Sequence, residues 1–501
     1  MQFQGVLNSL INWGNQKILV EKLNNVFGYI VFTAIALAIS FLSVQDVTQK
    51  TIFIILFIVI SLPISVACFI NPLFGFFAAL IYSSSIFLLE RLFGDIPSSL
   101  GIDALIIITF LGILNKGKKL PRGVYFNPVN LVVVAWILYS VVQLFNPNLT
   151  TNVDFFQRIR GTLSFCITYY LIVTLTLERN FIRLFFIFWI VIASLASLYA
   201  LYQEYFGLPW FDLKWVTSSK ELIGLNFIGG RWRKWSFLSD CTAFGMFMAS
   251  SIIASIVLLL GSIRFKMVPV FSFIIVTLTL AMIYSGTRTA YAMIPAGLSI
   301  YFILTFDNKK TVLFLITGVF FVVFLYFGPF YGPNISRLRS VVQPTEDASF
   351  DVREYNRSRI QPYIYSHPFG GGANTTGVVG KVLYPDHELA GFPPDSGYLK
   401  IALEYGWIGL ALRFLMFATI MMTGTFSFLK VKDRKIRYYY LVIISVFFSL
   451  TIAYFAQVSV YQHPMSLIIF TIYALMNNLK YHDSTYISKF LILDHTRHNR
   501  D

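Results

Sequence analysis

Long apolar stretches recur along almost the whole chain, and they constrain its fold more than any motif does. A helix that spans a lipid bilayer needs roughly 20 apolar residues, and a window of that length predicts about fourteen spans. The predicted spans lie at 27–44, 51–70, 72–90, 100–115, 128–145, 161–177, 184–205, 238–259, 268–285, 290–306, 311–328, 397–423, 438–457 and 464–478. Charged residues make up only 13% of the chain, whereas a soluble domain carries roughly a quarter. The sequence therefore predicts an all-α, polytopic transmembrane protein.

The distribution of basic residues predicts how the chain is oriented. Lysines and arginines gather in the links 115–122 and 430–437 and in the C-terminal tail. With an even number of spans, these links and both termini lie on one side, which the positive-inside rule makes the cytoplasm. This topology explains much of the net charge of +15, so nucleic acid is not expected as a partner. No removable signal peptide is recognised, and the first span is expected to direct insertion.

These spans divide the chain into four expected regions. Residues 1–328 would form the N-terminal transmembrane helices and include an outer loop at 207–238. Residues 329–396 would form a large outer loop, 397–478 the C-terminal transmembrane helices, and 479–501 a cytoplasmic tail. Loops of this length in a compact protein are usually functional or disordered, and the aromatic content of the large loop argues against full disorder.

Arginines gather in the outer segments, where topology does not require them. The candidate phosphate-binding arginines are Arg231 and Arg233 in the first loop, Arg288 in a short link, and Arg353, Arg357 and Arg359 in the large loop. The planar guanidinium holds phosphate oxygens in pairs, so a lipid-linked pyrophosphate is the predicted ligand. The alternative for each arginine is an ion pair with a loop carboxylate or a lipid phosphate. If their segment is helical, Arg353 and Arg357 share a face.

Two outer residues are candidates for acid–base chemistry. Asp395 and His387 lie near the end of the large loop, and either could accept a proton from an attacking sugar hydroxyl. The alternatives are that Asp395 caps the helix that follows it and that His387 is a solvated loop residue. The glycine run 370–372 suggests backbone N–H groups that face an anion. No metal, cofactor or nucleotide motif is present.

The order of several outer motifs resembles the O-antigen ligase and polysaccharide polymerase superfamily, often called the Wzy_C family. The motifs are Arg-Trp-Arg-Lys-Trp from Arg231, Ser-Gly-Thr-Arg-Thr-Ala from Ser285, Arg-Ser-Arg-Ile from Arg357, His-Pro-Phe-Gly-Gly-Gly from His367, and Asp-Ser-Gly-Tyr from Asp395 with Glu-Tyr-Gly-Trp-Ile-Gly after it. The resemblance covers roughly 231–409.

The resemblance implies a membrane glycosyltransferase with a GT-C-like fold that needs no metal or cofactor. Its substrate would be a glycan linked to undecaprenyl pyrophosphate, at the periplasmic face of a bacterial inner (cytoplasmic) membrane. Arg288, Arg357 and Arg359 match the pyrophosphate-binding positions of the family best. Membrane lipids and a chain-length regulator are further expected partners.

One departure bears on the choice of reaction. Ligases of the family carry a catalytic histidine at the helix start where this chain has Asp395. The Asp-Ser-Gly-Tyr run is more similar to the polymerases, which join repeat units into exopolysaccharide, capsule or O-antigen chains. The sequence therefore favours a polymerase. A ligase that moves glycan to another acceptor, a lipid-linked glycan transporter and a structural partner of an export complex stay as alternatives. Transporters usually show repeated halves, and none is visible in this sequence.

Overall fold

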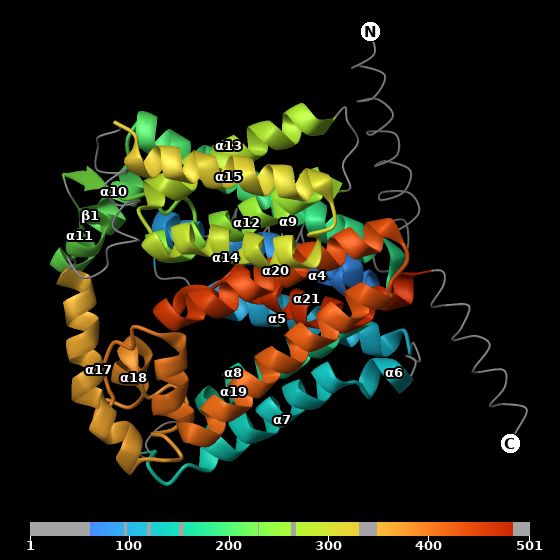
Figure 1. The fold of residues 1–501 in the computed structure, drawn as a ribbon. Coiled ribbons are helices and arrows are strands. Elements are labelled where there is room, and N and C mark those ends of the chain that lie inside the picture. The colour runs from blue at the N-terminus through green and yellow to red at the C-terminus, as the bar shows by residue number, and fades with distance from the viewer. Residues whose placement is uncertain are drawn as a thin grey trace, which may run out of the picture. The chain divides into compact units, whose positions relative to one another are not determined.

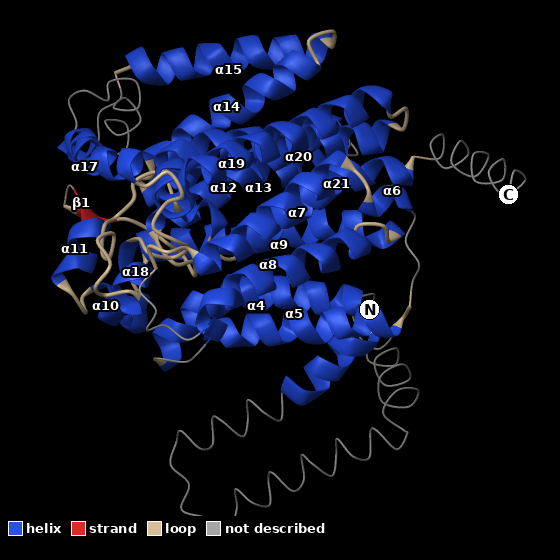
Figure 2. Ribbon diagram, turned by 90° about the horizontal axis from the view of Figure 1, so that it is seen from below, coloured by secondary structure: helices blue, strands red, loops and turns tan. Residues whose placement is uncertain are grey.

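The computed structural model describes residues 61–94, 98–117, 122–149, 155–228, 230–261, 267–329 and 348–483. The described residues are almost entirely helical (Figures 1 and 2). The predicted span at 27–44, part of that at 51–70, and most of the tail lie outside them.

The helices follow the apolar stretches of the sequence. After a helix at Ser61–Ile70 come α4 (Pro72–Phe93), α5 (Ser98–Asn115), α6 (Arg122–Tyr125), α7 (Pro128–Val142), η2 (Gln143–Phe145), α8 (Phe155–Leu175), α9 (Arg179–Tyr205), α10 (Trp210–Val216), α11 (Lys220–Asn226), α12 (Cys241–Gly261), α13 (Val268–Ser285), α14 (Arg288–Leu304), α15 (Lys309–Phe327), α17 (Ala348–Ser366), α18 (Gly377–Leu383), α19 (Gly397–Lys430), α20 (Arg434–Ala456), η5 (Ser459–Tyr461), α21 (Met465–Asn478) and η6 (Leu479–His482). Strands β1 (Phe227–Ile228) and β2 (Arg231–Trp232) pair antiparallel in the first outer loop.

Seven helices of the described part are long and apolar enough to cross a membrane. They are Pro72–Phe93, Pro128–Phe145, Asn180–Tyr205, Cys241–Gly261, Val268–Ser285, Gly397–Lys430 and Arg434–Ala456. Shorter apolar helices occupy Ser61–Ile70, Ser99–Asn115 and Arg288–Leu304. The all-α membrane class is thus confirmed, while the number of fourteen spans stays a prediction.

The chain divides into two compact units. The first comprises Met1–Ala78 and Leu105–Gly117. In its described part, Gly75 of α4 allows close packing on α5, because a Cβ there would lie 2.2 Å from Oγ1 of Thr109. The second unit comprises Ala79–Ala104 and Lys118–Asp501 and holds every candidate site residue.

The second unit is built around α12, whose most apolar window is 89% buried. This helix packs on α9, α13, α14 and α20. Ser250 and Ser251 bond back to their own helix, and Ser251 also accepts a hydrogen bond from the indole N–H of Trp189 (3.0 Å). Small and hydroxyl-bearing side chains let membrane helices approach closely.

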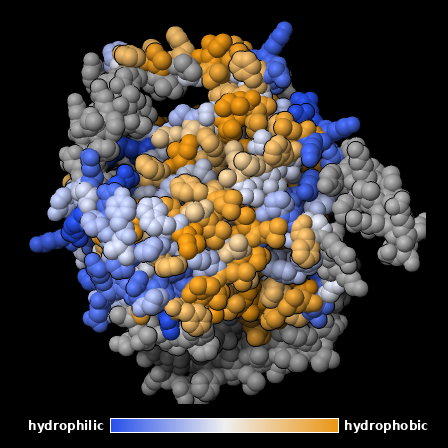
Figure 3. Space-filling model, turned by 60° about the horizontal axis from the view of Figure 1, so that its bottom comes forward, coloured by the Kyte–Doolittle hydropathy of each residue, from blue (hydrophilic) through white to orange (hydrophobic). Residues whose placement is uncertain are grey.

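Outer helices of the second unit expose apolar faces. On α7, Leu131, Leu138 and Val142 are exposed, whereas Val133 and Trp136 are buried. Exposed leucine and valine at helical spacing suit a lipid-facing surface. On the face drawn in Figure 3, hydrophobic residues fill much of the middle and hydrophilic residues lie toward both sides.

Candidate functional site

The segment of the large loop that contains Arg353 and Arg357 is helical, which the sequence alone did not decide. Helix α17 spans Ala348–Ser366, so Arg353 and Arg357 lie one turn apart on one face; the side chain of Arg353 is outside the described residues. The Arg357 guanidinium carbon lies 5.0 Å from the ring centroid of Phe455, at the end of α20. The neighbouring Asn356 donates a hydrogen bond from Nδ2 to Oδ2 of Asp395 (3.4 Å). Helix α17 therefore brings Arg357 to the segment that contains Asp395.

Ser396, and not Asp395, caps helix α19. The Ser396 hydroxyl oxygen accepts a hydrogen bond from the backbone N–H of Leu399 at 3.5 Å. The capping alternative for Asp395 is therefore wrong, and its carboxylate is left with Asn356 as its hydrogen-bond partner. The start of α19 also packs tightly on α20, since a Cβ at Gly397 would lie 2.0 Å from the ring of Tyr454.

Arg288 begins a helix beside the same end of α20. It is the first residue of α14, and the hydroxyl of the next residue, Thr289, accepts a hydrogen bond from Nε2 of Gln457 (3.4 Å). Gln457 directly follows α20. We call the region around Phe455 and Gln457, where the segments that contain Arg288, Arg357 and Asp395 come together, the α20 corner. Guanidinium groups can hold a phosphate-bearing group, and a carboxylate nearby can accept a proton.

Arg233 supports the turn from which Arg288 starts. Its Nε donates to the carbonyl of Ser285 (2.8 Å) and its Nη2 to the hydroxyl of Thr287 (3.1 Å). Its Nη1 donates to the carbonyl of Leu225 (3.2 Å). The guanidinium thus bonds to the protein on three sides and links the first outer loop to the start of α14.

The other two predicted phosphate-binding arginines are more open. Arg231 lies exposed on β2, and Arg359 lies exposed on α17. Neither side chain forms an ion pair with another described residue. These arginines are therefore available at the surface of their two segments.

The glycine run bonds to a break in α19 instead of facing an anion. Within α19, Gly406 has φ +67° and ψ −166°, which interrupts the helix. The N–H groups of Gly371 and Gly372 donate to the carbonyls of Leu403 (2.8 Å) and Glu404 (2.9 Å). In return, the N–H of Trp407 donates to the carbonyl of Pro368 (2.9 Å). The suggested anion-binding role of these N–H groups is therefore wrong.

Three side-chain amides hold the same turn from the other side. Gln143 Nε2 donates to the carbonyl of Phe369 (3.0 Å), and Asn148 Nδ2 to that of Gly370 (3.0 Å). Asn146 Nδ2 reaches both carbonyls, at 3.3 and 3.1 Å. We call Gln143, Asn146 and Asn148 the amide bracket. Sequence reasoning missed it, although three amides within a few residues after a span were a visible signal.

Glu404 joins the loop to the first part of α19. Its carboxylate is buried and accepts hydrogen bonds from the hydroxyl (2.5 Å) and the N–H (3.3 Å) of Thr376. Lys400 Nζ lies 3.8 Å from the same oxygen. Lys400 and Glu404, one turn apart on α19, are thus paired, and Glu404 also joins the loop to the helix.

His387 is buried in the loop, so the solvated alternative is wrong. Its Nδ1 accepts a hydrogen bond from the N–H of Leu389 (3.0 Å). Burial lowers the pKa of His387 below its usual value. Nearby, burial and the charge of Glu388 raise the pKa of Tyr363 to about 12. His387 therefore lies beside the glycine run, and no hydrogen bond joins it to the carboxylate of Asp395 in the described structure.

Several other cations of the second unit are ion-paired. Arg160 bonds Asp103 (2.7 Å), Arg91 lies 3.2 Å from Asp212, and Lys234 lies 3.2 Å from Glu204. These cations therefore stabilise the fold through ion pairs. Among the described residues, no group of three or more His, Cys, Asp or Glu could hold a metal ion.

Comparison with known proteins finds one matching family model, over part of the chain. No curated protein matches the chain. Residues 273–414 match the family model Wzy_C, described as O-antigen ligase. The matched range includes α14 with Arg288, the described part of the large loop, and the break in α19. The resemblance to the O-antigen ligase family that the sequence motifs indicate is therefore confirmed over residues 273–414.

Proposed function

We propose that the chain is a membrane glycosyltransferase that polymerises lipid-linked glycan repeat units at the periplasmic face of a bacterial inner membrane. The observation that carries this proposal is the α20 corner, where Arg288, Arg357 and Asp395 come from three separate segments. Positive charge stabilises a departing pyrophosphate, and a carboxylate beside it can serve as a general base.

The proposed reaction is a single transfer of a glycan. The hydroxyl of the acceptor sugar attacks the anomeric carbon of the donor glycan, and a new C–O bond forms there. The bond from that carbon to the pyrophosphate oxygen breaks, and its electron pair leaves with undecaprenyl pyrophosphate. The Asp395 carboxylate takes up the hydroxyl proton, while Arg288 and Arg357 hold the leaving pyrophosphate.

The remaining candidates receive supporting roles. Arg231, Arg353 and Arg359 would extend the cationic surface over which the donor approaches. Arg233 would act by positioning the turn before Arg288, because its donors already bond to protein atoms. We prefer Asp395 to His387 as the base, because Nδ1 of His387 already accepts a hydrogen bond from the N–H of Leu389.

A ligase is the second candidate, and the description of the matching family model favours it. A ligase would use the same corner but move the glycan to a different acceptor, such as lipid A core. The residue at the start of α19 favours the polymerase, because Asp395 stands where the ligases carry a histidine.

The proposal includes the expected topology, which has about fourteen spans, a GT-C-like arrangement and both termini in the cytoplasm. The proposed reaction needs no metal. The proposed regions are 1–328, 329–396, 397–478 and 479–501. A chain-length regulator is a proposed partner.

The test is the lipid-linked glycan profile of a strain that lacks this protein. Single repeat units on the carrier, with no long chains, would support the polymerase. Long chains left on the carrier would support the ligase. An unchanged profile would contradict both. Restoration by the wild-type gene, but not by Asp395→Asn, would tie the activity to the α20 corner.

A further inference from the structure

A second polar site lies at the far ends of the helices that begin near the α20 corner. A cavity of about 470 Å³ opens between the end of α14, the end of α19 and the start of α20. Helix α14 begins with Arg288 and ends at Leu304, and α19 begins at Gly397 and ends at Lys430. The cavity thus lies at the opposite ends of these helices from the proposed catalytic residues.

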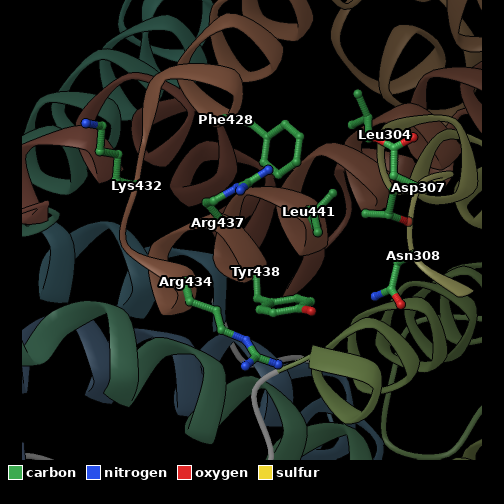
Figure 4. Close-up of a pocket in the computed structure, with 10 residues that line it drawn as sticks. Leu304, Asp307, Asn308, Phe428, Lys432, Arg434, Arg437, Tyr438 and Leu441 are labelled. Atoms are coloured by element: carbon green, nitrogen blue, oxygen red, sulfur yellow. The ribbon is translucent and has the colours of Figure 1, made fainter. Parts of the chain in front are cut away.

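Positive charge dominates the lining of this cavity. Lys432, Arg434 and Arg437 line it together with one carboxylate, Asp307. Figure 4 shows the arginines on the side of α20, with Asp307 and Asn308 across from them. Among the described residues, none of the three cationic side chains has an ion-pair partner. The cavity therefore carries an excess of positive charge.

Aromatic rings hold the two guanidinium groups. The Arg434 guanidinium carbon lies 5.8 Å from the ring centroid of Tyr438, and that of Arg437 lies 5.0 Å from that of Phe428. A stacked guanidinium keeps its N–H edge available for paired bonds to phosphate oxygens. These contacts limit the freedom of the side chains before any ligand binds.

Apolar side chains complete the lining beside the polar Thr305 and Asn308. Leu304, Phe428 and Leu441 contribute to the lining, and the last two are almost fully buried. From the mouth of the cavity, α15 continues with the exposed residues Leu313, Ile316 and Phe320. A charged mouth beside an apolar helix face matches a molecule with an anionic head and hydrocarbon chains.

We propose that this cavity binds the phosphate headgroup of an anionic phospholipid, with its acyl chains along the exposed face of α15. Basic pockets between membrane helices bind such headgroups in this way. The inference is independent of the proposed transfer reaction, because it rests on residues away from the α20 corner.

The test measures lipid binding to the full-length protein in detergent by native mass spectrometry. Phosphatidylglycerol should bind the wild type more tightly than phosphatidylcholine does. Each of Arg434→Gln and Arg437→Gln should weaken phosphatidylglycerol binding by roughly fivefold. Asp307→Asn should strengthen it, because a like charge is removed. The matched control is Lys435→Gln, an exposed cation of the same helix that does not line the cavity.

The double variant Arg434→Lys/Arg437→Lys keeps both positive charges and shows whether loss of binding comes from misfolding. It should retain the preference for phosphatidylglycerol. Equal binding of both lipids to the wild type, or equal weakening by Lys435→Gln, would overturn the proposal. Glycerol phosphate is added as a soluble probe. If it displaced phosphatidylglycerol at comparable concentration, the site would recognise a soluble phosphate instead, and the lipid assignment would be wrong.

Discussion

The backbone N–H of Trp407 donates to the carbonyl of Pro368, 2.9 Å away, and not to the carbonyl four residues earlier in its own helix. That earlier carbonyl, of Leu403, accepts from Gly371 instead. Loop and helix thus exchange hydrogen bonds across the break at Gly406. Because unpaired backbone groups are costly in a buried place, neither segment can hold this shape without the other. The exchange links the large loop to the helix that starts beside Asp395.

Replacement of Gly406 by alanine should release the loop from α19. Its backbone angles suit glycine, and an added Cβ would lie 2.0 Å from the carbonyl oxygen of Pro368. Strain of this kind costs about 1–3 kcal/mol, and the steric clash adds to it. We expect faster proteolysis of the loop and loss of polymer, measured in membranes. Gly318→Ala is the matched control, since open space surrounds that position; equal sensitivity of both variants would contradict the prediction.

The amide bracket should stabilise the same turn. Asn146→Ala removes the hydrogen bonds to the carbonyls of Phe369 and Gly370, and buried polar groups left without a partner cost about 1–3 kcal/mol. We expect a lower melting temperature and faster amide exchange around Gly371. The control is Gln361→Ala, because Gln361 bonds only the exposed Tyr365 hydroxyl. An unchanged exchange rate in Asn146→Ala would show that the bracket does not hold the turn.

Local composition predicts the long apolar helices of the described residues, because a bilayer selects apolar stretches of nearly fixed length. Even α13 and α14, a closely abutted pair, appear as two helices separated by Gly286 with φ +61°. Helix α17 was harder to predict, since its residues are polar on average and the buried apolar residues described on it, Ile360, Tyr363 and Ile364, lie in its last turns.

The candidate site residues were chosen by residue type, and the sequence did not predict how they are arranged. The arginines and Asp395 were identified because charge outside a membrane is conspicuous. The residue that caps α19 was not identified from the sequence. Serine and aspartate are about equally good caps, and Asp395 and Ser396 are neighbours in the chain. The amide bracket depends on contacts between residues more than 200 positions apart, such as Asn146 and Gly370, and one sequence does not reveal such pairing.

Arg288 and Arg357 should be required for polymer growth. Replacing either with alanine removes a cationic fork from the α20 corner, and we expect at least about a hundredfold less polymer, with normal membrane insertion. Lysine should restore only part of the activity, because it lacks the paired donors. Arg160→Ala serves as control, as that arginine is exposed and pairs with Asp103. Normal polymer from both alanine variants would refute these roles.

Asp395 and Ser396 offer a way to separate chemistry from capping. Asp395→Asn keeps the size of the side chain but removes its basicity. We expect the rate of polymer growth to fall by about 10²–10⁴-fold, as is typical when a general base is lost. Ser396→Ala removes the cap and should lower the free energy of unfolding by about 1 kcal/mol while polymer still forms. Polymer length and melting temperature are measured for both variants. If Asp395→Asn kept the full rate, another group would have to accept the proton.

His387 should make the stability of the loop depend on pH. Burial lowers its pKa in the folded protein below the usual 6.5, so the unfolded loop binds more protons in the range between the two values. The contribution of neutral His387 is therefore complete above about pH 6.5 and decreases as the pH falls toward the lowered pKa. Protonation also removes the acceptor for the N–H of Leu389. Amide exchange at Leu389, corrected for its intrinsic pH dependence, should accelerate below that pH in the wild type. His387→Gln should lose the pH dependence. His367→Gln should retain it at a slightly higher pH, because the charge of His367 also lowers the pKa of His387. A wild-type profile without any change would contradict the assignment.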